Sequence, residues 1–238
     1  MSGALLAVED IHTYYGEAHI LQGVTISVGA GEVVTLIGRN GAGKTTTLLS
    51  IMGIARPRRG RIRFRGDDIG GLDSHEIAQR GIAWVPEERR VIPNLTVLEN
   101  LRLGMLGAGR GDGGAGRLEQ VFEFFPQLRE RIEQRGRSLS GGEQQMLAIA
   151  RGLVARPGLM LIDEPTEGLA PLLVQNLTEI LRQINRGGTT ILLVEQSLEV
   201  ALALSHRLYV IDQGRIQFEG TPAALRVEPT IQHRFLGV

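Results

Sequence analysis

The chain has 238 residues, which is long enough to bury the core of one large α/β domain or of a core domain with a small appended one. Its 26 basic and 26 acidic residues balance, so no net positive field draws it toward nucleic acid or an anionic membrane. It has no cysteine, which excludes disulfides, thiol nucleophiles and cysteine-ligated zinc, and its five histidines lie without the spacing of a metal site.

The amino terminus carries no sign of a targeting segment. The first ten residues, MSGALLAVED, lack the charged start and the long apolar stretch of a signal peptide. No apolar run approaches the roughly 20 residues that a membrane span needs. We therefore expect a cytosolic protein that does any work at a membrane through a partner.

Alternating apolar residues predict antiparallel strands in the first part of the chain. They cover residues 5–15, 22–28 and 61–64. The segment Gly66-Asp67-Asp68 predicts a turn, in which two solvated aspartates are more plausible than a catalytic pair. A small antiparallel β-subdomain is therefore expected beside the core.

Four apolar runs without alternation predict strands that are buried on both faces of a parallel sheet. They cover residues 32–37, 159–162, 189–194 and 207–211. Helical patterns follow at residues 44–52 and 172–185, and this alternation of strand and helix predicts a doubly wound α/β core. Residues 96–153 read as mostly helical, with a glycine-rich mobile surface loop expected at residues 104–116.

The segment GRNGAGKT, at residues 38–45, lies between a predicted strand and a predicted helix. In that context its glycines let successive backbone N–H groups point at phosphates, assisted by the helix start, whereas the pattern alone would be only a turn. We expect Lys44 to reach the β and γ phosphates of a nucleotide, Thr45 to bind Mg²⁺ and Thr46 to contact a neighbouring phosphate. The residues expected to bind ATP in this loop are Gly38, Arg39, Asn40, Gly41, Ala42, Gly43, Lys44, Thr45 and Thr46.

Two acidic residues, Asp163 and Glu164, follow the strand predicted at residues 159–162. Ligands of doubly wound folds bind at this edge of the sheet. We expect Asp163 to hold Mg²⁺ through water and Glu164 to orient or deprotonate the attacking water. Two acids after an apolar run are a weak signal alone, but together with the phosphate-binding loop they indicate nucleotide hydrolysis.

The segment LSGGEQQ, at residues 139–145, combines a capping box of Ser140 and Glu143 with Gly141 and Gly142. The glycines leave the helix start bare enough for a phosphate to approach the backbone. Together with the loop upstream and the acids downstream, this segment resembles the signature of the ATP-binding cassette ATPases, and the resemblance covers nearly the whole chain. It implies an α/β P-loop NTPase core of the RecA-like type, with a mostly parallel sheet.

The same resemblance implies one ABC ATP-binding domain over residues 1–238. It would contain an antiparallel β-subdomain and a helical subdomain at approximately residues 88–155, which carries the signature. In this family the signature of one subunit contacts the ATP held by the P-loop of the other. We therefore expect a head-to-tail dimer with a second ATPase subunit or with a second copy. In it, Ser140, Gly141, Gly142 and Glu143 would contact the partner's ATP.

Tyr15 matches the family's aromatic residue that stacks on adenine. A tyrosine in a strand more often only packs against its neighbours. We expect Tyr15 to bind the adenine of ATP, since stacking on an aromatic face tolerates small differences of position.

Three positions depart from the family pattern. Glu87 stands at the usual Q-loop glutamine, and its carboxylate is expected to bind Mg²⁺. Gln196 stands at the switch histidine, where its amide donates to the γ-phosphate but cannot become cationic, which predicts slower hydrolysis. Ala170 stands where the D-loop normally ends in aspartate, so communication between the sites of a dimer is expected to differ.

The segments VPEERRV, DEPTEGLAP, VEQS and the terminal FLG resemble the second ATP-binding subunit of branched-chain amino-acid importers. They also resemble the urea and short-chain amide relatives of that subunit. This resemblance implies transmembrane permease subunits, a second ATPase subunit and, indirectly, a periplasmic substrate-binding protein as partners, with no nucleic acid. The chain would lie at the cytoplasmic face of the inner membrane, attached through the permeases.

Three other interpretations stay open. A soluble cassette protein acting on the ribosome or DNA usually has two cassettes or a long coiled-coil insertion, and neither is found. A P-loop kinase or GTPase would leave LSGGEQQ unexplained. A regulatory cassette that binds ATP without hydrolysis is suggested by Gln196 and Ala170, although Glu164 speaks against it.

Overall fold

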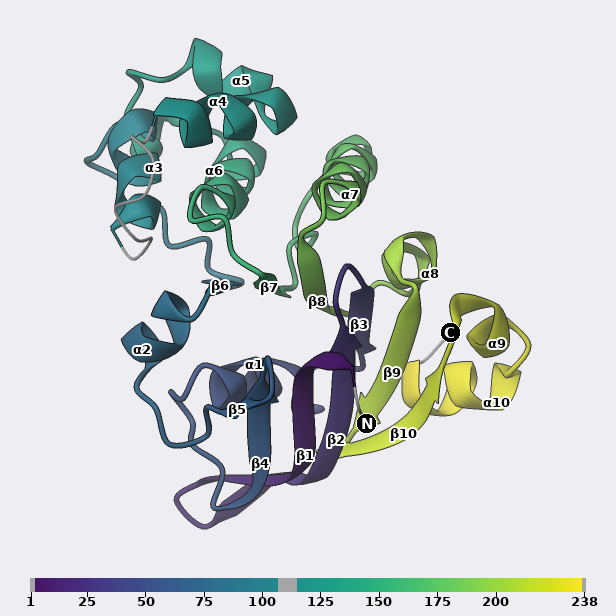
Figure 1. The fold of residues 1–238 in the computed structure, drawn as a ribbon. Helices are drawn as coiled ribbons and strands as arrows, with labels where there is room; N and C mark the ends of the chain where they lie inside the picture. The colour runs from purple at the N-terminus through teal and green to yellow at the C-terminus, as the bar shows by residue number, and fades with distance from the viewer. Residues whose placement is uncertain (1–2, 107–114, 237–238) are drawn as a thin grey trace. The chain divides into compact units, whose positions relative to one another are not determined.

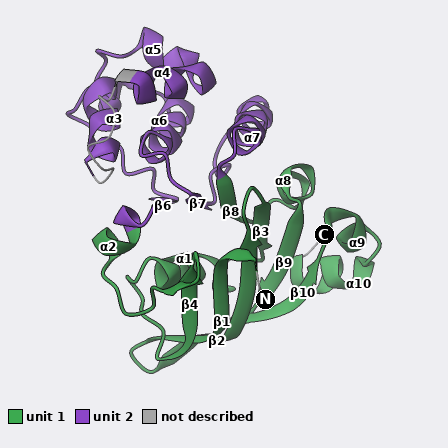
Figure 2. Cartoon of the chain, in the orientation of Figure 1, with its two compact units in different colours: residues 1–77, 190–238 green, residues 78–189 purple. Residues whose placement is uncertain are grey.

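The computed structural model describes residues 3–106 and 115–236, which fall into two compact units (Figure 2). Unit 1 comprises residues 1–77 and 190–238, and unit 2 comprises residues 78–189. Figure 1 follows the elements along the chain. The predicted single domain, with its helical subdomain near residues 88–155, stays a prediction.

Unit 1 contains an antiparallel sheet in the order β2-β1-β4-β5. Its strands are β1 (Ala4–Tyr15), β2 (Ala18–Gly29), β4 (Arg59–Phe64) and β5 (Asp67–Asp68). The β-subdomain predicted from alternation is confirmed, because buried and less buried residues alternate along β1, with Leu6 and Val8 buried before an irregularity at Asp10 and Ile11 and Thr13 buried after it. The turn predicted at Gly66-Asp67-Asp68 is confirmed for Gly66 and wrong for the two aspartates, since Arg65 and Gly66 form the turn. Both aspartates are exposed and pair with the end of β4, and the turn lies just before them.

The second set of strands in unit 1 has the order β10-β9-β3-β8. It consists of β3 (Val33–Ile37), β8 (Thr190–Glu195), β9 (Arg207–Asp212) and β10 (Arg215–Gly220). β3 is parallel to both β8 and β9, whereas β10 runs antiparallel to β9. Every residue of β3 and β8 is buried, as expected for the centre of a parallel sheet. The alternating edge strand β10 was not predicted.

The helices of unit 1 surround these strands (Figure 1). They are α1 (Lys44–Ile51), α8 (Leu198–Leu204), α9 (Pro222–Arg226), α10 (Pro229–Ile231) and a π-helical turn, η2 (Gln232–Leu236); α2 (Ser74–Gln79) crosses the unit boundary. Near the end of the chain, Phe235 is buried in a cluster with Leu208, Val210 and Leu225. Burial of this ring attaches the last described turn to the sheet of unit 1.

Unit 2 contains two parallel strands, β6 (Ile82–Val85) and β7 (Leu159–Asp163), and is otherwise mostly helical. The helices are α3 (Val97–Met105), α4 (Ala115–Phe124), α5 (Pro126–Glu130), the short 3₁₀ turn η1 (Gly136–Ser138), α6 (Gly141–Leu153) and α7 (Pro171–Arg186). The loop predicted at residues 104–116 is shorter at both ends than expected, since α3 extends to Met105 and α4 starts at Ala115. Residues 107–114 of that prediction lie outside the described residues.

A glycine explains why α3 extends past the predicted start of the loop. A Cβ atom at Gly104 would lie 2.1 Å from the carbonyl oxygen of Arg151 in α6. The close approach of α3 and α6 therefore requires glycine at this position, and this glycine is a contact point between helices rather than a loop residue.

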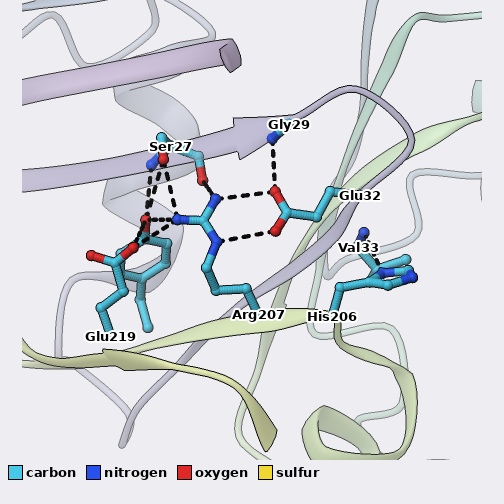
Figure 3. Close-up of polar contacts among 8 residues, drawn as sticks. Ser27, Gly29, Glu32, Val33, His206, Arg207 and Glu219 are labelled. Carbon is cyan, nitrogen blue, oxygen red and sulfur yellow. Dashed lines mark hydrogen bonds and ion pairs between the residues drawn. The ribbon is translucent and has the colours of Figure 1, made fainter. Parts of the chain in front are cut away.

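An ionic network on unit 1 joins β9 to the turn between β2 and β3 (Figure 3). The Arg207 guanidinium donates to both carboxylate oxygens of Glu32, at 3.0 Å each, and to the Ser27 carbonyl at 2.8 Å. It also donates to Glu219 and to the hydroxyl of Tyr209. Burial, the largest single influence, raises the pKa of Glu32, but the hydrogen bonds from Arg207 and from the Gly29 N–H, together with the positive charge of Arg207, outweigh it, so the pKa is lowered. The ion pair therefore connects the start of β9 to the turn before β3, at the amino ends of these two parallel strands.

None of the helices within residues 3–106 and 115–236 has both the length and the apolar character needed to cross a membrane.

Candidate functional site

The phosphate-binding loop predicted from GRNGAGKT begins where β3 ends, at the carboxyl edge of the strands in unit 1. Gly38 follows the last β3 residue, and a Cβ atom there would lie 2.4 Å from the carbonyl oxygen of Ile211 in β9. Only glycine permits this approach, so the loop turns directly over the sheet edge.

Two further glycines give the loop its curvature. Gly41 has φ 78° and Gly43 has φ 110°, both in the left-handed region that disfavours residues with a side chain. Gly43 is also the N-cap of α1, where it provides no side-chain hydrogen bond to the helix start, and no acidic residue lies in the first turn. The start of α1 therefore has no side-chain cap at Gly43 and no acidic residue in its first turn, which favours an anionic ligand.

Lys44 is the first residue of α1 and is only 4% exposed. Its ammonium donates to the carbonyl oxygens of Gly38 at 2.9 Å and Arg39 at 3.1 Å. The side chain thus folds back onto its own loop, which places a buried positive charge beside these two carbonyl groups. Thr45 follows in α1 and is partly buried, and Thr46 is buried.

The loop is supported from a part of the chain that sequence reasoning missed. Gly214, in the turn between β9 and β10, donates its N–H to the carbonyl of Ala42 at 2.9 Å, and its own carbonyl accepts from Gln22 at 2.8 Å. A Cβ atom at Gly214 would lie 1.9 Å from the carbonyl oxygen of Ile20. The tight turn signalled by the Asp212-Gln213-Gly214 sequence was the only available hint, and it does not say what the turn supports.

Gln196 lies at the same edge of unit 1 as the loop. The register of β3 and β8 pairs Ile37 with Glu195, so the residues that follow each strand leave the sheet side by side. Gln196 is exposed, while the buried Glu195 carboxylate accepts from the backbone N–H groups of Gln196 at 3.1 Å and Ser197 at 3.3 Å. Glu195 was not predicted as a site residue, although it fixes the backbone that presents Gln196.

Tyr15 ends β1 in unit 1 and is 49% exposed. It pairs with Ala18 at the turn of the β1–β2 hairpin, whereas its neighbour Tyr14 stacks on His19. An exposed aromatic ring at the end of a strand is available for stacking on a planar ligand.

The predicted acidic residues lie together at the edge of unit 2. The register of β6 and β7 pairs Val85 with Ile162, which brings the segments starting at Pro86 and Asp163 out of the sheet side by side. Asp163 is fully buried, Glu164 is 8% exposed with φ 42°, and Glu87 is exposed. The left-handed backbone at a non-glycine residue is strained, and such strain is found where a side chain must take a particular direction.

The signature segment forms the start of α6 in unit 2, as predicted. The Glu143 N–H donates to the Ser140 hydroxyl at 3.3 Å, and the Ser140 N–H donates to the Glu143 carboxylate at 2.8 Å. This backbone hydrogen bond lowers the pKa of Glu143 despite an opposing effect of burial, and Arg131, 2.6 Å away, lowers it further. The glycines are tightly placed, since a Cβ at Gly142 would lie 2.7 Å from Leu173.

Three further hydrogen bonds in unit 2 join α6 to the segment that contains Glu87. Arg151 donates to the carbonyls of Arg90 at 2.7 Å and Arg89 at 3.2 Å, and the Arg89 side chain donates to Gln145 at 3.2 Å. Arg89 and Arg90 both have positive φ. Helix α6 is therefore hydrogen-bonded to the strained segment that follows Glu87 in the sequence, and no local sequence pattern indicated this link.

Ala170 is the N-cap of α7, and it provides no side-chain hydrogen bond to the helix start. Aspartate, the residue that the family pattern predicts there, is among the best N-caps. The departure therefore removes a cap as well as a charge, and Pro171 at the first helical position partly compensates for the lost cap.

Each unit has groups of a kind that Mg-ATP binds. Unit 1 has the loop amides, the Lys44 ammonium and the Thr45 hydroxyl, and unit 2 has the Asp163 and Glu87 carboxylates. Amides and ammonium match phosphate oxygens, whereas hydroxyl and carboxylate oxygens are the ligands that Mg²⁺ prefers.

Comparison with known proteins agrees with this chemistry. The family model described as "ABC transporter" matches residues 21–167. The high-affinity branched-chain amino acid transport ATP-binding protein BraG of Pseudomonas aeruginosa is 46% identical, over 98% of this chain and 100% of the relative. The lipopolysaccharide export system ATP-binding protein LptB of Escherichia coli is 33% identical, over 98% of each chain.

A solved structure gives the same result at the level of the fold. The dimeric post-hydrolysis state of an ATP-binding cassette bound to ADP and Pi matches with a TM-score of 0.81 and 27% identity, covering 91% of this chain and 98% of that one. The family model spans more than half of the chain, and the relatives span almost all of it. The chain belongs to the ABC transporter family and is an ATP-binding, ATP-hydrolysing cassette of a membrane transporter complex.

Proposed function

We propose that this chain energises import of branched-chain amino acids by binding and hydrolysing Mg-ATP as one half of a head-to-tail cassette dimer. The observation that carries the ATP site is the phosphate-binding loop, where the buried Lys44 donates to the carbonyls of Gly38 and Arg39 and the N-cap of α1 is a glycine without a side-chain hydrogen bond. The 46% identity to BraG over its full length supports the substrate.

In this proposal the loop residues Gly38 to Thr46 bind the phosphates of ATP, and the exposed ring of Tyr15 stacks on the adenine. Lys44 neutralises charge on the β and γ phosphates. Thr45, Asp163 and Glu87 hold Mg²⁺, which neutralises phosphate charge when bound.

Glu164 is the proposed base that orients or deprotonates the attacking water. Its small exposure and strained backbone at the end of β7 support this role, because both restrict the direction of the carboxylate. Gln196 is proposed to hydrogen-bond the γ-phosphate, since it is exposed beside the loop within unit 1. Its amide cannot take a positive charge, so hydrolysis at this loop should be slower than with a histidine.

The signature residues Ser140, Gly141, Gly142 and Glu143 are proposed to contact the ATP held by a partner cassette. Support comes from the helix start that they form and from the dimeric state of the solved relative. The partner is a second ATPase subunit or a second copy, and permease subunits connect the dimer to a periplasmic binding protein. The chain would then lie at the cytoplasmic face of the inner membrane.

The site is tested with Glu164→Gln in the presence of the partner cassette. The amide keeps the shape of the side chain but loses the base, so ATP binding should persist, turnover should fall by about 10²- to 10⁴-fold and an ATP-bound dimer should accumulate. A variant that hydrolyses ATP at the normal rate would exclude Glu164 as the base. If the variant chain stays monomeric at saturating ATP, although the partner cassette is present, the result would contradict the proposed dimer.

The substrate is tested by reconstituting the chain in liposomes with its permeases, second cassette and binding protein. ATP hydrolysis should rise when leucine, isoleucine or valine is added with the binding protein. Stimulation by urea or a short-chain amide instead would identify the alternative importer. No stimulated hydrolysis with any of these, while nucleotide binding is normal, would favour a regulatory cassette.

A further inference from the structure

The β1–β2 hairpin of unit 1 brings together two histidines, although their spacing in the sequence does not suggest a metal site. His12 lies in β1 and His19 in β2, and both are partly buried. Their side chains share the outer face of the antiparallel sheet, because the flanking residues Ile11 and Thr13 are fully buried on the other face.

The two rings approach each other through nitrogen atoms. The Nδ1 atom of His12 lies 3.1 Å from the Nε2 atom of His19, and the ring planes are inclined by 29°. Two imidazoles bound to one ion at 2.0–2.1 Å would have their nitrogens about 3.3 Å apart at a tetrahedral angle and about 2.9 Å apart at a right angle. The observed separation therefore lies within the range that a shared metal ion requires.

A carboxylate orients the first of these rings. The Oδ1 atom of Asp10 lies 3.3 Å from the Nε2 atom of His12. If His12 carries its proton on Nε2, facing Asp10, its Nδ1 lone pair is directed toward His19. Histidines that bind metals almost always donate their other N–H group to a carboxylate, a carbonyl or water in this way.

The backbone around Asp10 is built to admit this carboxylate. Asp10 has φ 47° in an irregular stretch of β1, and its N–H donates to the Thr25 hydroxyl at 2.9 Å. Across the hairpin, a Cβ atom at Gly23 would lie 2.8 Å from Asp10 Oδ1 and 3.6 Å from His12 Nε2. Any side chain at Gly23, where φ is 86°, would therefore crowd the carboxylate.

The second ring is oriented by stacking. His19 stacks on Tyr14 with ring centroids 4.1 Å apart and planes inclined by 7°, and the Arg58 guanidinium lies 4.4 Å from the Tyr14 centroid. These contacts limit the rotation of His19 and keep its Nε2 atom directed toward His12.

We propose that His12 and His19 form a binding site for one divalent transition-metal ion of the class that prefers imidazole, such as Zn²⁺, Ni²⁺ or Cu²⁺. The metal takes the place of the proton between the two rings, and the proton of a neutral His19 moves through solvent from Nε2 to Nδ1, so both rings bind as neutral imidazoles. In the described part of the chain no group of three or more His, Cys, Asp or Glu residues is arranged to hold a metal, so water completes the coordination. The ion joins β1 to β2 close to the hairpin turn that carries Tyr15.

The test uses the full-length protein without an affinity tag and without nucleotide, because tags and ATP both bind these metals. Zn²⁺, Ni²⁺ and Cu²⁺ are titrated separately by calorimetry, and thermal unfolding is followed in parallel. One equivalent should bind and the unfolding temperature should rise. His12→Gln and His19→Gln should each abolish the saturable binding.

Two further variants show whether the binding depends on this site in particular. His75→Gln, which removes an exposed histidine on α2, should leave binding unchanged. Asp10→Asn, which leaves both rings in place, should weaken binding by about 10- to 100-fold, because it removes the carboxylate that faces His12 Nε2. Absence of one-equivalent binding, or binding that survives in both His12→Gln and His19→Gln, would overturn the proposal. If those variants fail to fold, NMR of the wild-type imidazoles decides: His12 and His19 signals that do not respond to metal exclude the site.

Discussion

Two helices of this protein have glycine at or directly before their first residue and are proposed to contact a phosphate, yet their N-termini are capped differently. Helix α1 in unit 1 begins after Gly43, a left-handed residue without a side chain to cap the helix. Helix α6 in unit 2 begins after Ser140, whose hydroxyl and the Glu143 carboxylate satisfy two backbone N–H groups reciprocally. The first helix start is open to a ligand, and the second is already partly satisfied.

The difference in capping indicates that the two helix starts have different roles toward ATP. The start of α1, which has no side-chain cap and has the buried Lys44 ammonium in the same loop, gains the most from a bound triphosphate. The capped α6 start is stable by itself and presents the Ser140 hydroxyl and the remaining amides to an ATP that another subunit holds. We therefore expect substitutions at α1 to affect ATP affinity, and substitutions at α6 to affect mainly turnover in the dimer.

The largest expected effect is that of Lys44→Ala on nucleotide affinity. Loss of two charge-assisted hydrogen bonds, at about 1.5 kcal/mol each, should weaken ATP binding by more than about a hundredfold. Calorimetry with Mg-ATP measures this. Arg39→Ala is the matched control, because Arg39 is exposed and contributes its carbonyl to Lys44. Equal losses in both variants would show that the general charge of the loop matters rather than the buried ammonium.

Gly43→Ala should have the next largest effect, and it should reduce both stability and affinity. A Cβ atom would lie 2.8 Å from Leu21 in β2, at a residue with φ 110°. Strain of this kind costs about 1–3 kcal/mol, and it would displace the α1 amides. Denaturant unfolding and ATP titration measure the two effects. Gly41→Ala is the control, since its φ of 78° is strained but no atom lies within 4 Å of its Cβ. A smaller effect at Gly43 than at Gly41 would contradict the role of close packing.

Ser140→Ala should cost about 1 kcal/mol of stability, the typical value for loss of an N-cap hydroxyl. Turnover by the assembled dimer should fall, while ATP affinity of the isolated chain stays unchanged. Thr96→Ala is the matched control, because Thr96 and Glu99 form the same capping box at the start of α3. A drop in ATPase activity of equal size in both variants would mean that Ser140 acts only through helix stability.

The smallest effect is expected for Glu143→Gln, and it should depend on pH. The Ser140 N–H and Arg131 hold the pKa of Glu143 below its ordinary value of 4.5. A group with a lowered folded-state pKa stabilises the fold above the unfolded-state pKa, and that contribution is lost as pH falls through the folded-state pKa. Chemical unfolding of the wild type and the variant should therefore differ at pH 7 and converge as the pH falls through the lowered folded-state pKa of Glu143. A difference that is constant with pH would contradict the carboxylate's role.

Much of the fold follows from local pattern. The four parallel strands predicted from uninterrupted apolar runs match β3, β7, β8 and β9 to within one residue at each end. Such runs are unambiguous because both faces of the central strands are buried. Strands β6 and β10 were not predicted, since β6 has only four residues and β10 alternates at an edge, where packing imposes a weaker pattern.

The sequence by itself determined the chemistry of the site, because the glycines, Lys44 and the capping box of Ser140 and Glu143 act through the backbone next to them. Only the tertiary structure decided what supports that chemistry. Gly214 donates a hydrogen bond to Ala42 in the phosphate-binding loop, although the two residues are more than 170 positions apart, and Arg151 donates to the segment that follows Glu87. His12 and His19 likewise meet only because the hairpin register places them side by side. Local patterns record the torsions and hydrogen bonds of neighbouring residues, whereas contacts between distant segments depend on how the strands pair.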